Sequence, residues 1–325
     1  MSMLQVSAFG GINKLVYTEN DENVDAELDN DEVLVSVLVA GVNAIDTKIR
    51  QGSSFAAKNR GERFPWTIGF DMSGEVVKIP RGCKTFKKGD LVCGLIGFPL
   101  EGGAYCSLGK FKQSELVKIP KGCDVKSAGA LPMAGLTAYQ ALFDVGHLKA
   151  GETVIISAAA GGVGHIAVQL AKKAGARVLA IGSKENHEFL KSIGADDVEE
   201  YHNDECLRWQ SEADLVIDLV GGQSAISNLS LLKINSRMVS VPTITFQAVK
   251  LAASNLSSEV LGMVVKPNCE QLKYLLTMIA NGELKVKISL SFFLKDGAKA
   301  HNVIEDGHAL GKLILLPNGI IKENK

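Results

Sequence analysis

The 325-residue sequence lacks an excess of charge of either sign, a long hydrophobic run and any C-x-x-C pair. A net charge of −1 is not typical of a nucleic-acid-binding protein. The apolar runs are short or are broken by glycine and lysine, so no membrane-spanning helix is predicted. The N-terminus, MSMLQVSAFGG, also lacks the basic region and apolar core of a signal peptide. We therefore expect a cytoplasmic protein without a nucleic-acid or membrane partner.

The cysteines are few and dispersed, which argues against a structural zinc site and against a disulfide framework. The six lie at positions 83, 93, 106, 123, 206 and 269. We interpret them as small buried hydrophobic residues.

The chain is long and has an ordinary share of apolar residues. With 325 residues, 46% of them hydrophobic, the chain is predicted to form two domains, because single cores usually stop growing at about 250–300 residues.

The first part of the chain is predicted to be rich in β-strands. Short β-branched runs at 32–39, 74–79 and 90–94 alternate with turn-forming glycine, proline and lysine. The polar stretch 52–66 between them is interpreted as a mobile loop, of the kind that often forms a lid. Helical patterns begin near residue 127.

Strands and helices then alternate, which is typical of a parallel sheet built from βαβ units. The expected strands include 153–157, 177–181, 214–219 and 236–241. After a helix at 270–281 the pattern becomes β-like again, and the final strand at 312–316 is expected to complete the first domain. The predicted fold is α/β: a Rossmann doubly wound parallel sheet, residues 124–283, inserted in a discontinuous β-rich domain of residues 1–123 and 284–325.

The stretch 152–174, ETVIISAAAGGVGHIAVQLAKKA, reads as a strand, a glycine turn and a helix. Such a turn lets the backbone approach a diphosphate, whose charge the start of the helix favours. Ala159 stands where the first glycine of G-x-G-x-x-G would be, so the motif alone is weak. Ala160, Gly161, Gly162 and Val163 are the candidate diphosphate-binding residues.

The strand at 177–181 leads into Gly182, Ser183 and Lys184 rather than into the acidic residue that normally binds the ribose of NAD. A hydroxyl and a cation suit a 2′-phosphate, so NADP(H) is the expected cofactor. Glu185 next to them weakens this argument. The alternative is that Ser183 and Lys184 only cap and solvate the following helix.

Five motifs in order, LPMAGLTAYQAL, AAAGGVGHIAVQLAK, GADDVEEYHN, DLVIDLVGG and GHALGKLILLP, resemble the zinc-independent quinone oxidoreductases of the medium-chain dehydrogenase/reductase superfamily. The resemblance covers nearly the whole chain. It implies a GroES-like catalytic domain around the Rossmann domain, an NADP(H)-dependent oxidoreductase and a homodimer. The 260–265 stretch is the expected dimer strand, although an apolar strand alone does not separate an edge from a core position.

The resemblance also assigns expected site residues. Tyr201 matches a tyrosine that contacts the adenosine side of the cofactor, and Thr137 matches a residue near the nicotinamide and its phosphate. Asn43 is placed beside the nicotinamide, where its amide could also donate to a substrate oxygen. Asp46 is expected to orient the site or relay a proton, with a helix cap as an equal alternative. The tyrosines that some relatives carry after this segment have no counterpart between Arg50 and Pro65.

No metal is expected. Zinc-dependent relatives use a cysteine and a histidine where this chain has Asn43 and Phe70, and a catalytic zinc needs three ligands from Cys, His and carboxylate. His165 is interpreted as an exposed helix histidine rather than one that faces the phosphates. His301 and His308 are placed at the surface. Lys312 is expected to be a solvated strand lysine, although the resemblance places its segment where relatives bring the C-terminal part of the chain near the cofactor.

These observations favour hydride transfer from NADPH to a small quinone without zinc. Reduction of an α,β-unsaturated carbonyl compound (alkenal, enone or enoyl thioester) on the same scaffold is the alternative. A non-catalytic NADPH-binding protein remains a third hypothesis, because no acid–base residue is obvious, and a zinc alcohol dehydrogenase is the most distant one.

Overall fold

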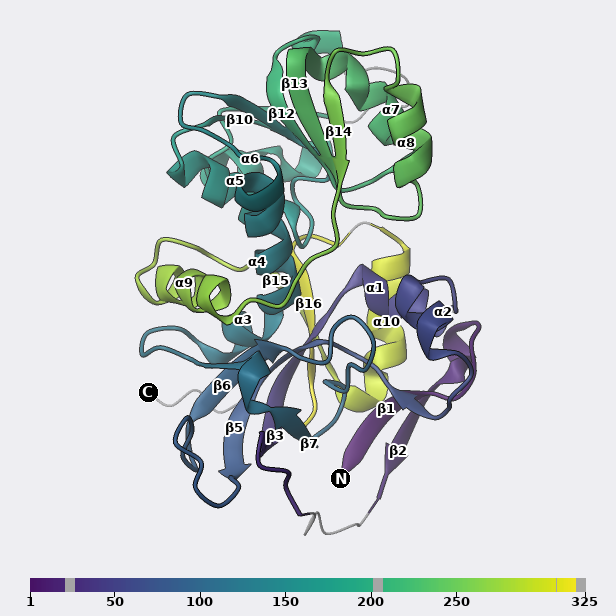
Figure 1. Cartoon of the computed structure of the whole chain (residues 1–325), viewed down its shortest axis with the longest axis vertical. Coiled ribbons are helices and arrows are strands. Elements are labelled where there is room, and N and C mark those ends of the chain that lie inside the picture. The colour runs from purple at the N-terminus through teal and green to yellow at the C-terminus, as the bar shows by residue number, and fades with distance from the viewer. Residues whose placement is uncertain (21–26, 201–206, 308, 320–325) are drawn as a thin grey trace. The chain divides into compact units, whose positions relative to one another are not determined.

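The computed structural model describes residues 1–20, 27–200, 207–307 and 309–319. The chain forms two compact units (Figure 1). Unit 1 contains Met1–Ala134 and Lys266–Lys325, and unit 2 contains Gly135–Val265. One continuous unit is thus inserted in a discontinuous one. The predicted domain boundaries, after residue 123 and before residue 284, remain a prediction; the compact units change over at Ala134 and Lys266.

Unit 1 contains two sheets. A three-stranded antiparallel sheet has the order β2-β1-β4, and a seven-stranded sheet has the order β15-β16-β3-β5-β6-β8 with β7 paired to β3. The strands are β1 (Ser2–Val6), β2 (Leu15–Glu19), β3 (Glu32–Val42), β4 (Trp66–Thr67), β5 (Asp71–Lys78), β6 (Leu91–Leu95), β7 (Leu108–Lys112), β8 (Leu116–Lys118), β15 (Ile288–Phe293) and β16 (Lys312–Leu316).

The central strand of the larger sheet is β3. Its sequence, EVLVSVLVAGV, is rich in β-branched residues, and Val33, Val35, Val37 and Val39 are fully buried. The helices of unit 1 are α1 (Ala44–Arg50), α2 (Phe55–Arg60), α3 (Val125–Ala130), α9 (Cys269–Ala280) and α10 (Gly297–Glu305), and α4 (Pro132–Tyr139) begins there. Helices α1 and α10 lie beside each other (Figure 1). The carboxyl end of β3 runs directly into α1, which places residue 43 at that junction.

Unit 2 has a six-stranded parallel sheet with the order β11-β10-β9-β12-β13-β14. Its strands are β9 (Thr153–Ile156), β10 (Arg177–Ile181), β11 (Asp197–Glu199), β12 (Ala213–Asp218), β13 (Leu232–Ser240) and β14 (Glu259–Gly262). Its helices are α5 (Gly164–Lys173), α6 (His187–Ser192), α7 (Gly222–Ser227) and α8 (Phe246–Ala252). This is the doubly wound order 3-2-1-4-5-6, with α5 and α6 on one side of the sheet and α7 and α8 on the other (Figure 1).

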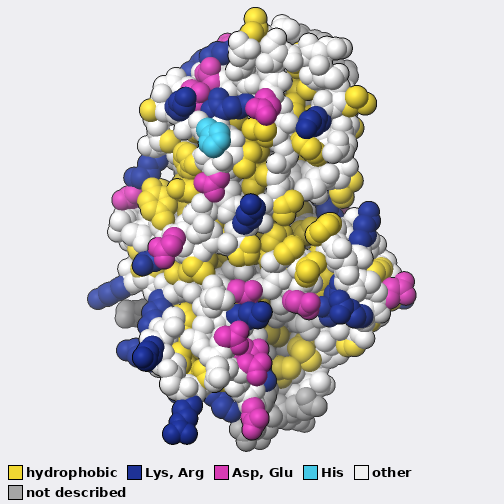
Figure 2. All heavy atoms as spheres, viewed as in Figure 1, with side chains coloured by type: hydrophobic (Ala, Val, Ile, Leu, Met, Phe, Trp, Pro, Cys, Tyr) yellow, Lys and Arg dark blue, Asp and Glu magenta, His cyan; other side chains and the backbone are white. Residues whose placement is uncertain are grey.

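The surface of the chain carries mixed charge. On the face shown in Figure 2, Lys and Arg side chains are interspersed with Asp and Glu, so neither sign dominates that face. Among the residues that the structure describes, no helix is both long enough and apolar enough to span a membrane.

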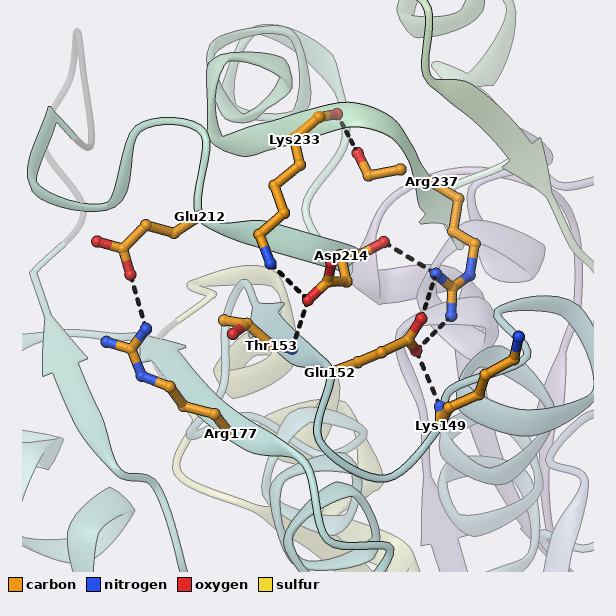
Figure 3. A network of polar contacts seen from close by, with 9 residues as sticks. Lys149, Glu152, Thr153, Arg177, Glu212, Asp214, Lys233 and Arg237 are labelled. Atoms are coloured by element: carbon orange, nitrogen blue, oxygen red, sulfur yellow. Dashed lines mark hydrogen bonds and ion pairs between the residues drawn. The ribbon is translucent and has the colours of Figure 1, made fainter.

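A network of ion pairs and hydrogen bonds joins the segments near the amino-terminal ends of β9 and β12 (Figure 3). Arg237 donates to both carboxylate oxygens of Glu152, at 3.1 and 2.7 Å. Asp214 accepts from Lys233 at 2.7 Å and from the backbone N–H of Thr153 at 2.8 Å. Arg237 and Lys233 are thus paired with Glu152 and Asp214 at the amino-terminal edge of the sheet. We ascribe a structural role to these four residues. The ligand-binding edge of such a sheet is the opposite, carboxyl one.

The predicted fold class is confirmed, and most of the predicted elements are present. The strands at 177–181 and 312–316 have the predicted bounds. The 260–265 stretch is a strand only as far as Gly262. The interpretation of 52–66 as a mobile loop is wrong for Phe55–Arg60, which form α2.

Candidate active site

The glycine turn of unit 2 connects β9 to α5 at the point where the strand order of the sheet reverses. Ala158 adopts a left-handed conformation with φ of 46°. A Cβ on Gly164 would lie 2.4 Å from the carbonyl oxygen of Ala158, so only glycine allows this close approach of turn and helix. Gly161, Gly162 and Val163 are partly exposed between these two residues. The turn therefore has the backbone form and the position that a dinucleotide diphosphate needs.

The buried side chain of His165 stabilises the glycine turn. It is fully buried, and its Nδ1 lies 2.8 Å from the carbonyl oxygen of Gly161, which also accepts the backbone N–H of His165 at 3.1 Å. The prediction of an exposed His165 is wrong, because the imidazole closes the first turn of α5.

On the neighbouring strand β12, Asp218 is buried and accepts the backbone N–H groups of Val220 and Gly221. Buried side chains, His165 after β9 and Asp218 at the end of β12, thus stabilise the backbone on both sides of the point where the strand order reverses.

Ser183 and Lys184 follow β10, which pairs in parallel with β9, so they lie at the same carboxyl edge of the sheet as the glycine turn. Ser183 is half-buried, and its Oγ accepts a hydrogen bond from the Asn186 amide at 2.8 Å. Lys184 is exposed. Thr137 is buried in α4. Tyr201 lies outside the described residues.

A second polar cluster lies in unit 1, at the junction of β3 and α1. Asn43 caps α1, and its backbone N–H donates to Asp46 Oδ2 at 2.8 Å. The hydroxyl of Tyr105 donates to the same oxygen at 2.8 Å. Asn43 is 8% exposed, and Asp46 and Tyr105 are fully buried. The structure therefore brings the two predicted catalytic residues together, and the cap that was the alternative role of Asp46 is real.

The pKa of Asp46 is raised to about 7 because burial disfavours its charged form; the two hydrogen bonds that it accepts and the charge of Lys312 oppose this only in part. Its other oxygen, Oδ1, has no hydrogen-bond partner among the described residues. A carboxyl group with this pKa can take up and release a proton near neutral pH, which is the property a proton relay needs.

Two further charged residues complete the cluster. Asp71 accepts the side-chain N–H of Asn43 at 2.9 Å and the backbone N–H of Met133 at 2.7 Å. Lys312, 2% exposed, donates to the carbonyl oxygen of Val42 at 3.1 Å and to Asn43 Oδ1, and its Nζ lies 3.5 Å from Asp71. The prediction of a solvated Lys312 is wrong, since the lysine is enclosed with the aspartate.

The burial of this ion pair acts on both partners. Removal from water raises the pKa of Asp71 and lowers the pKa of Lys312, while their mutual attraction and hydrogen bonds favour the charged forms. The carboxylate has donors on both oxygens and the ammonium has acceptors on three sides, so we treat both groups as charged.

Sequence reasoning missed Asp71, Lys312 and Tyr105 as members of the cluster. Lys312 precedes Leu313, which lies opposite Val42 in the antiparallel pairing of β16 and β3. Asp71 lies opposite Gly41 on the other side of β3. Only these long-range registers bring the residues together. The prediction of His301 at the surface is wrong, because it is fully buried with its ring 6.0 Å from that of Tyr105; His308 lies outside the described residues.

Comparison with known proteins identifies the family. The profile described as "alcohol dehydrogenase GroES-like domain" matches residues 29–142, and that described as "zinc-binding dehydrogenase" matches 193–315. The chloroplast envelope quinone oxidoreductase homolog of Arabidopsis thaliana is 32% identical, over 89% of this chain and 90% of its own length. The quinone oxidoreductase from Coxiella burnetii has a structure with a TM-score of 0.91 at 36% identity, covering 97% of this chain and 99% of that chain. This chain belongs to the quinone oxidoreductase-like family of the medium-chain dehydrogenase/reductase superfamily.

Membership in this family confirms the predicted resemblance and the class of enzyme, a nicotinamide-dependent oxidoreductase. A further family member, the Escherichia coli quinone oxidoreductase, was solved as a complex with NADPH; it has a TM-score of 0.83 at 26% identity and covers 98% of this chain and 100% of its own. The roles of individual residues, the choice between NADP and NAD, the substrate and the assembly of this chain remain predictions.

The zinc that the name of one matched profile implies does not fit the residues present. Asn43 binds Asp71 and Lys312 through its amide, and Phe70 is a buried apolar side chain whose ring lies 5.1 Å from that of Phe98. The ammonium group of Lys312 is a fixed cation beside the carboxylate of Asp71, so it competes with any metal there. A nicotinamide dinucleotide does fit the residues present, because the partly exposed turn of Gly161, Gly162 and Val163 leads into the start of α5 at the carboxyl edge of a doubly wound sheet.

Proposed function

We propose that this chain is an NADPH-dependent quinone oxidoreductase that transfers a hydride without zinc. The observation that carries the proposal is the end of β10. Ser183 and Lys184 stand there, beside the glycine turn, in place of the acidic residue that would favour NAD. The NADPH complex of the Escherichia coli relative and the names of the relatives from Coxiella burnetii and Arabidopsis thaliana support the cofactor and the substrate class.

In this proposal the residues of unit 2 bind the cofactor. The turn of Ala160–Val163 receives the diphosphate, and the dipole of α5 favours its charge. The N–H of Gly161 itself is bonded to the carbonyl oxygen of Ala158 at 3.0 Å and shapes the turn. Ser183 and Lys184 bind the 2′-phosphate, with the Lys184 ammonium as the opposite charge. Thr137 and Tyr201 keep the roles that the family resemblance assigns to them, near the nicotinamide phosphate and the adenosine. Bound NADPH supplies the hydride.

The residues of unit 1 act on the acceptor. Reduction of a quinone to a hydroquinone consumes one hydride and one proton. The hydride brings two electrons and one hydrogen, negative charge develops on a carbonyl oxygen, and the proton neutralises that charge. The Asn43 amide donates a hydrogen bond to that oxygen or to the nicotinamide carboxamide, and such donors lower the barrier where charge develops. Asp46, with its pKa of about 7, holds a proton that can pass toward the product.

Steady-state turnover tests the proposal. NADPH and NADH are each offered with a panel of quinones and of α,β-unsaturated ketones, aldehydes and enoyl thioesters, and oxidation is followed by the loss of nicotinamide absorbance. The proposal expects kcat/KM at least tenfold higher with NADPH than with NADH, and turnover of quinones. Preference for the conjugated compounds would favour the alternative function, since the Asn43 donor suits any carbonyl oxygen. Tight NADPH binding without turnover of any acceptor would identify a non-catalytic protein.

A further inference from the structure

Lys312 is the first residue of β16 and is 2% exposed, which is unusual for a lysine. Its Nζ contacts the carbonyl oxygen of Val42 at 3.1 Å, Asn43 Oδ1, and Asp71 Oδ2 at 3.5 Å. Enclosing a charged pair in this way costs desolvation energy, and an apolar pair of similar volume is often as stable. Fold stability alone therefore does not account for a lysine and an aspartate at these positions.

The contacts around Asn43 determine which way its amide faces. The Val42 carbonyl can only accept and the Met133 backbone N–H can only donate, so they fix Lys312 as a donor and Asp71 as an acceptor. Lys312 then binds the amide oxygen of Asn43, and Asp71 takes one of its two N–H groups at 2.9 Å. The reverse orientation would place the amide nitrogen against an ammonium and the amide oxygen against a carboxylate.

We propose that Lys312, together with Asp71, is a positioning residue that locks the Asn43 amide so that its second N–H, and not its oxygen, is offered to the ligand. The inference rests on the proposed function, because it concerns the same site. Its consequence is chemical selectivity. The second N–H of Asn43 then donates only to a group with a free lone pair, such as the carbonyl oxygen of a quinone or an enone. A ligand group that can only donate a hydrogen bond is not bound there.

A double-mutant cycle tests the inference. Lys312→Met alone leaves Asp71 as a buried unpaired charge and could fail to fold, so both charges are removed together in Lys312→Met/Asp71→Asn. In this variant the amide oxygen at position 71 can keep the Met133 N–H, which places the new NH2 group beside Asn43 and favours the reversed Asn43 amide. The matched control is Lys118→Met/Asp90→Asn, which removes a Lys–Asp pair with a distance of 2.8 Å from the same sheet, where Lys118 is half exposed. Thermal unfolding confirms that each variant is folded.

Removal of the buried pair is expected to lower kcat/KM for NADPH-dependent quinone reduction by at least about tenfold, since outright loss of one oriented donor costs roughly 100- to 1,000-fold and here the donor is misoriented rather than removed. In the Asn43→Ala background the same removal is expected to cost less than threefold, because the residue through which it acts is gone. The control pair should change turnover less than twofold. Equal losses in the two backgrounds, or no loss in the wild-type background, would overturn the inference.

A second readout separates this inference from the proposed function. In protein with 15N-labelled asparagine, the side-chain amide protons of Asn43 are assigned by their loss in Asn43→Ala, and their exchange with water is measured without ligand. The inference expects exchange at least tenfold faster in Lys312→Met/Asp71→Asn and unchanged exchange in the control. If the wild-type protein reduces no acceptor, the proposed function fails, and this measurement still decides the inference: unchanged exchange in the buried-pair variant rejects it.

Discussion

Asp46 combines a structural and a chemical property in one side chain. Oδ2 is held by the Asn43 backbone N–H and the Tyr105 hydroxyl, whereas Oδ1 has no hydrogen-bond partner within the described part of the chain. Burial raises its pKa from 3.8 to about 7. A cap at the surface would stay ionised at neutral pH, but this one is divided between its two protonation states.

This pKa predicts how stability changes with pH. Because the folded pKa lies above the unfolded one, the stability that the proton contributes is fully present below pH 3.8 and is lost as the pH rises through about 7. Asp46→Asn removes this titration. Between pH 4 and pH 8, we expect the free energy of unfolding of the wild type to fall by about 4 kcal/mol relative to that of the variant. Urea unfolding at each pH measures the difference.

The control for this experiment is Asp124→Asn, which changes an exposed aspartate that caps α3 through the backbone N–H of Ser127. It loses a capping carboxylate but no buried one. A stability difference between wild type and Asp46→Asn that stays constant over the whole pH range would contradict the raised pKa.

We propose that Lys184 determines the choice of cofactor. It is exposed at the end of β10, where a 2′-phosphate would be bound. Lys184→Ala is expected to raise KM for NADPH about tenfold and to change KM for NADH less than twofold, because only NADPH has the extra charge. Lys191→Ala, on the exposed face of α6, is the control for loss of a nearby positive charge. Equal effects of Lys184→Ala on the two cofactors would reject the phosphate role.

For single residues, the sequence is a better guide to which side chains belong to a site than to whether a side chain is buried. Asn43 and Asp46 are assigned one by one from the family resemblance, and the structure adds that the Asn43 backbone N–H donates to Asp46 Oδ2. Polarity alone places Lys312, His165 and His301 in solvent, yet all three are buried. Charge and polarity favour exposure on average, and only the partners seen in the structure, Asp71 for Lys312 and the Gly161 carbonyl for His165, reverse that preference.

The unit of β9, the glycine turn and α5 is predictable almost to the residue. A β-branched run followed by glycines and an apolar helical stripe leaves few other conformations, and the observed α5 ends at Lys173 as expected. Helix α2 escapes prediction because it has only six residues and no full apolar period. Its signals are local: Ser54 accepts the N–H of Ala57 at 3.0 Å, and Gly61 ends the helix with φ of 68°.

The close approach at Gly164 predicts a sharp sensitivity of this unit. In Gly164→Ala the new Cβ would lie 2.4 Å from the Ala158 carbonyl oxygen, so the turn must move. We expect a loss of about 1–3 kcal/mol in the free energy of unfolding and at least tenfold weaker NADPH binding. Chemical denaturation and fluorescence titration with NADPH measure the two effects.

Gly161→Ala is the matched control, because a Cβ there would lie 3.2 Å from the same oxygen and the backbone φ is not left-handed. It should cost less than about 1 kcal/mol. If both variants lose the same stability, the tight contact at Gly164 is not what shapes the turn.

Over the whole molecule, the arrangement that sequence reasoning could not supply is the meeting of Asn43, Asp71 and Lys312. They lie on or beside three strands that are neighbours in the order β16-β3-β5. Strand pairing between segments this far apart depends on the complete sheet, and a shift of one residue would turn each side chain to the other face. The alternation of strands and helices in unit 2 is local in sequence, which is why that fold is predictable.

We propose that the chain assembles as a homodimer through the edge of the unit 2 sheet. Within the described residues, β14 pairs only with β13, and the hollow beside β14 and α8 is lined by Phe246, Leu256 and Val260. Leu256 is 44% exposed. Leu256→Lys is expected to weaken the dimer at least tenfold, since it would bury an unpaired charge.

Sedimentation velocity over a dilution series measures this association. Phe55→Lys, at a 67% exposed position on α2 in unit 1, is the control for replacing an exposed apolar side chain by lysine and should leave the dimer intact. A wild-type protein that sediments as a monomer at every concentration would reject the proposal.

The central claim is hydride transfer from NADPH with Asn43 and its ion pair in place of zinc ligands. The most direct measurement is a single turnover of NADPH with a quinone, using protein dialysed against a chelator and shown by elemental analysis to be free of zinc. We expect NADPH oxidation at the same rate before and after chelation, slowed about two- to fivefold when the transferred hydrogen is deuterium. Loss of the reaction on chelation with recovery on adding zinc, or no oxidation of NADPH in any preparation, would contradict the account.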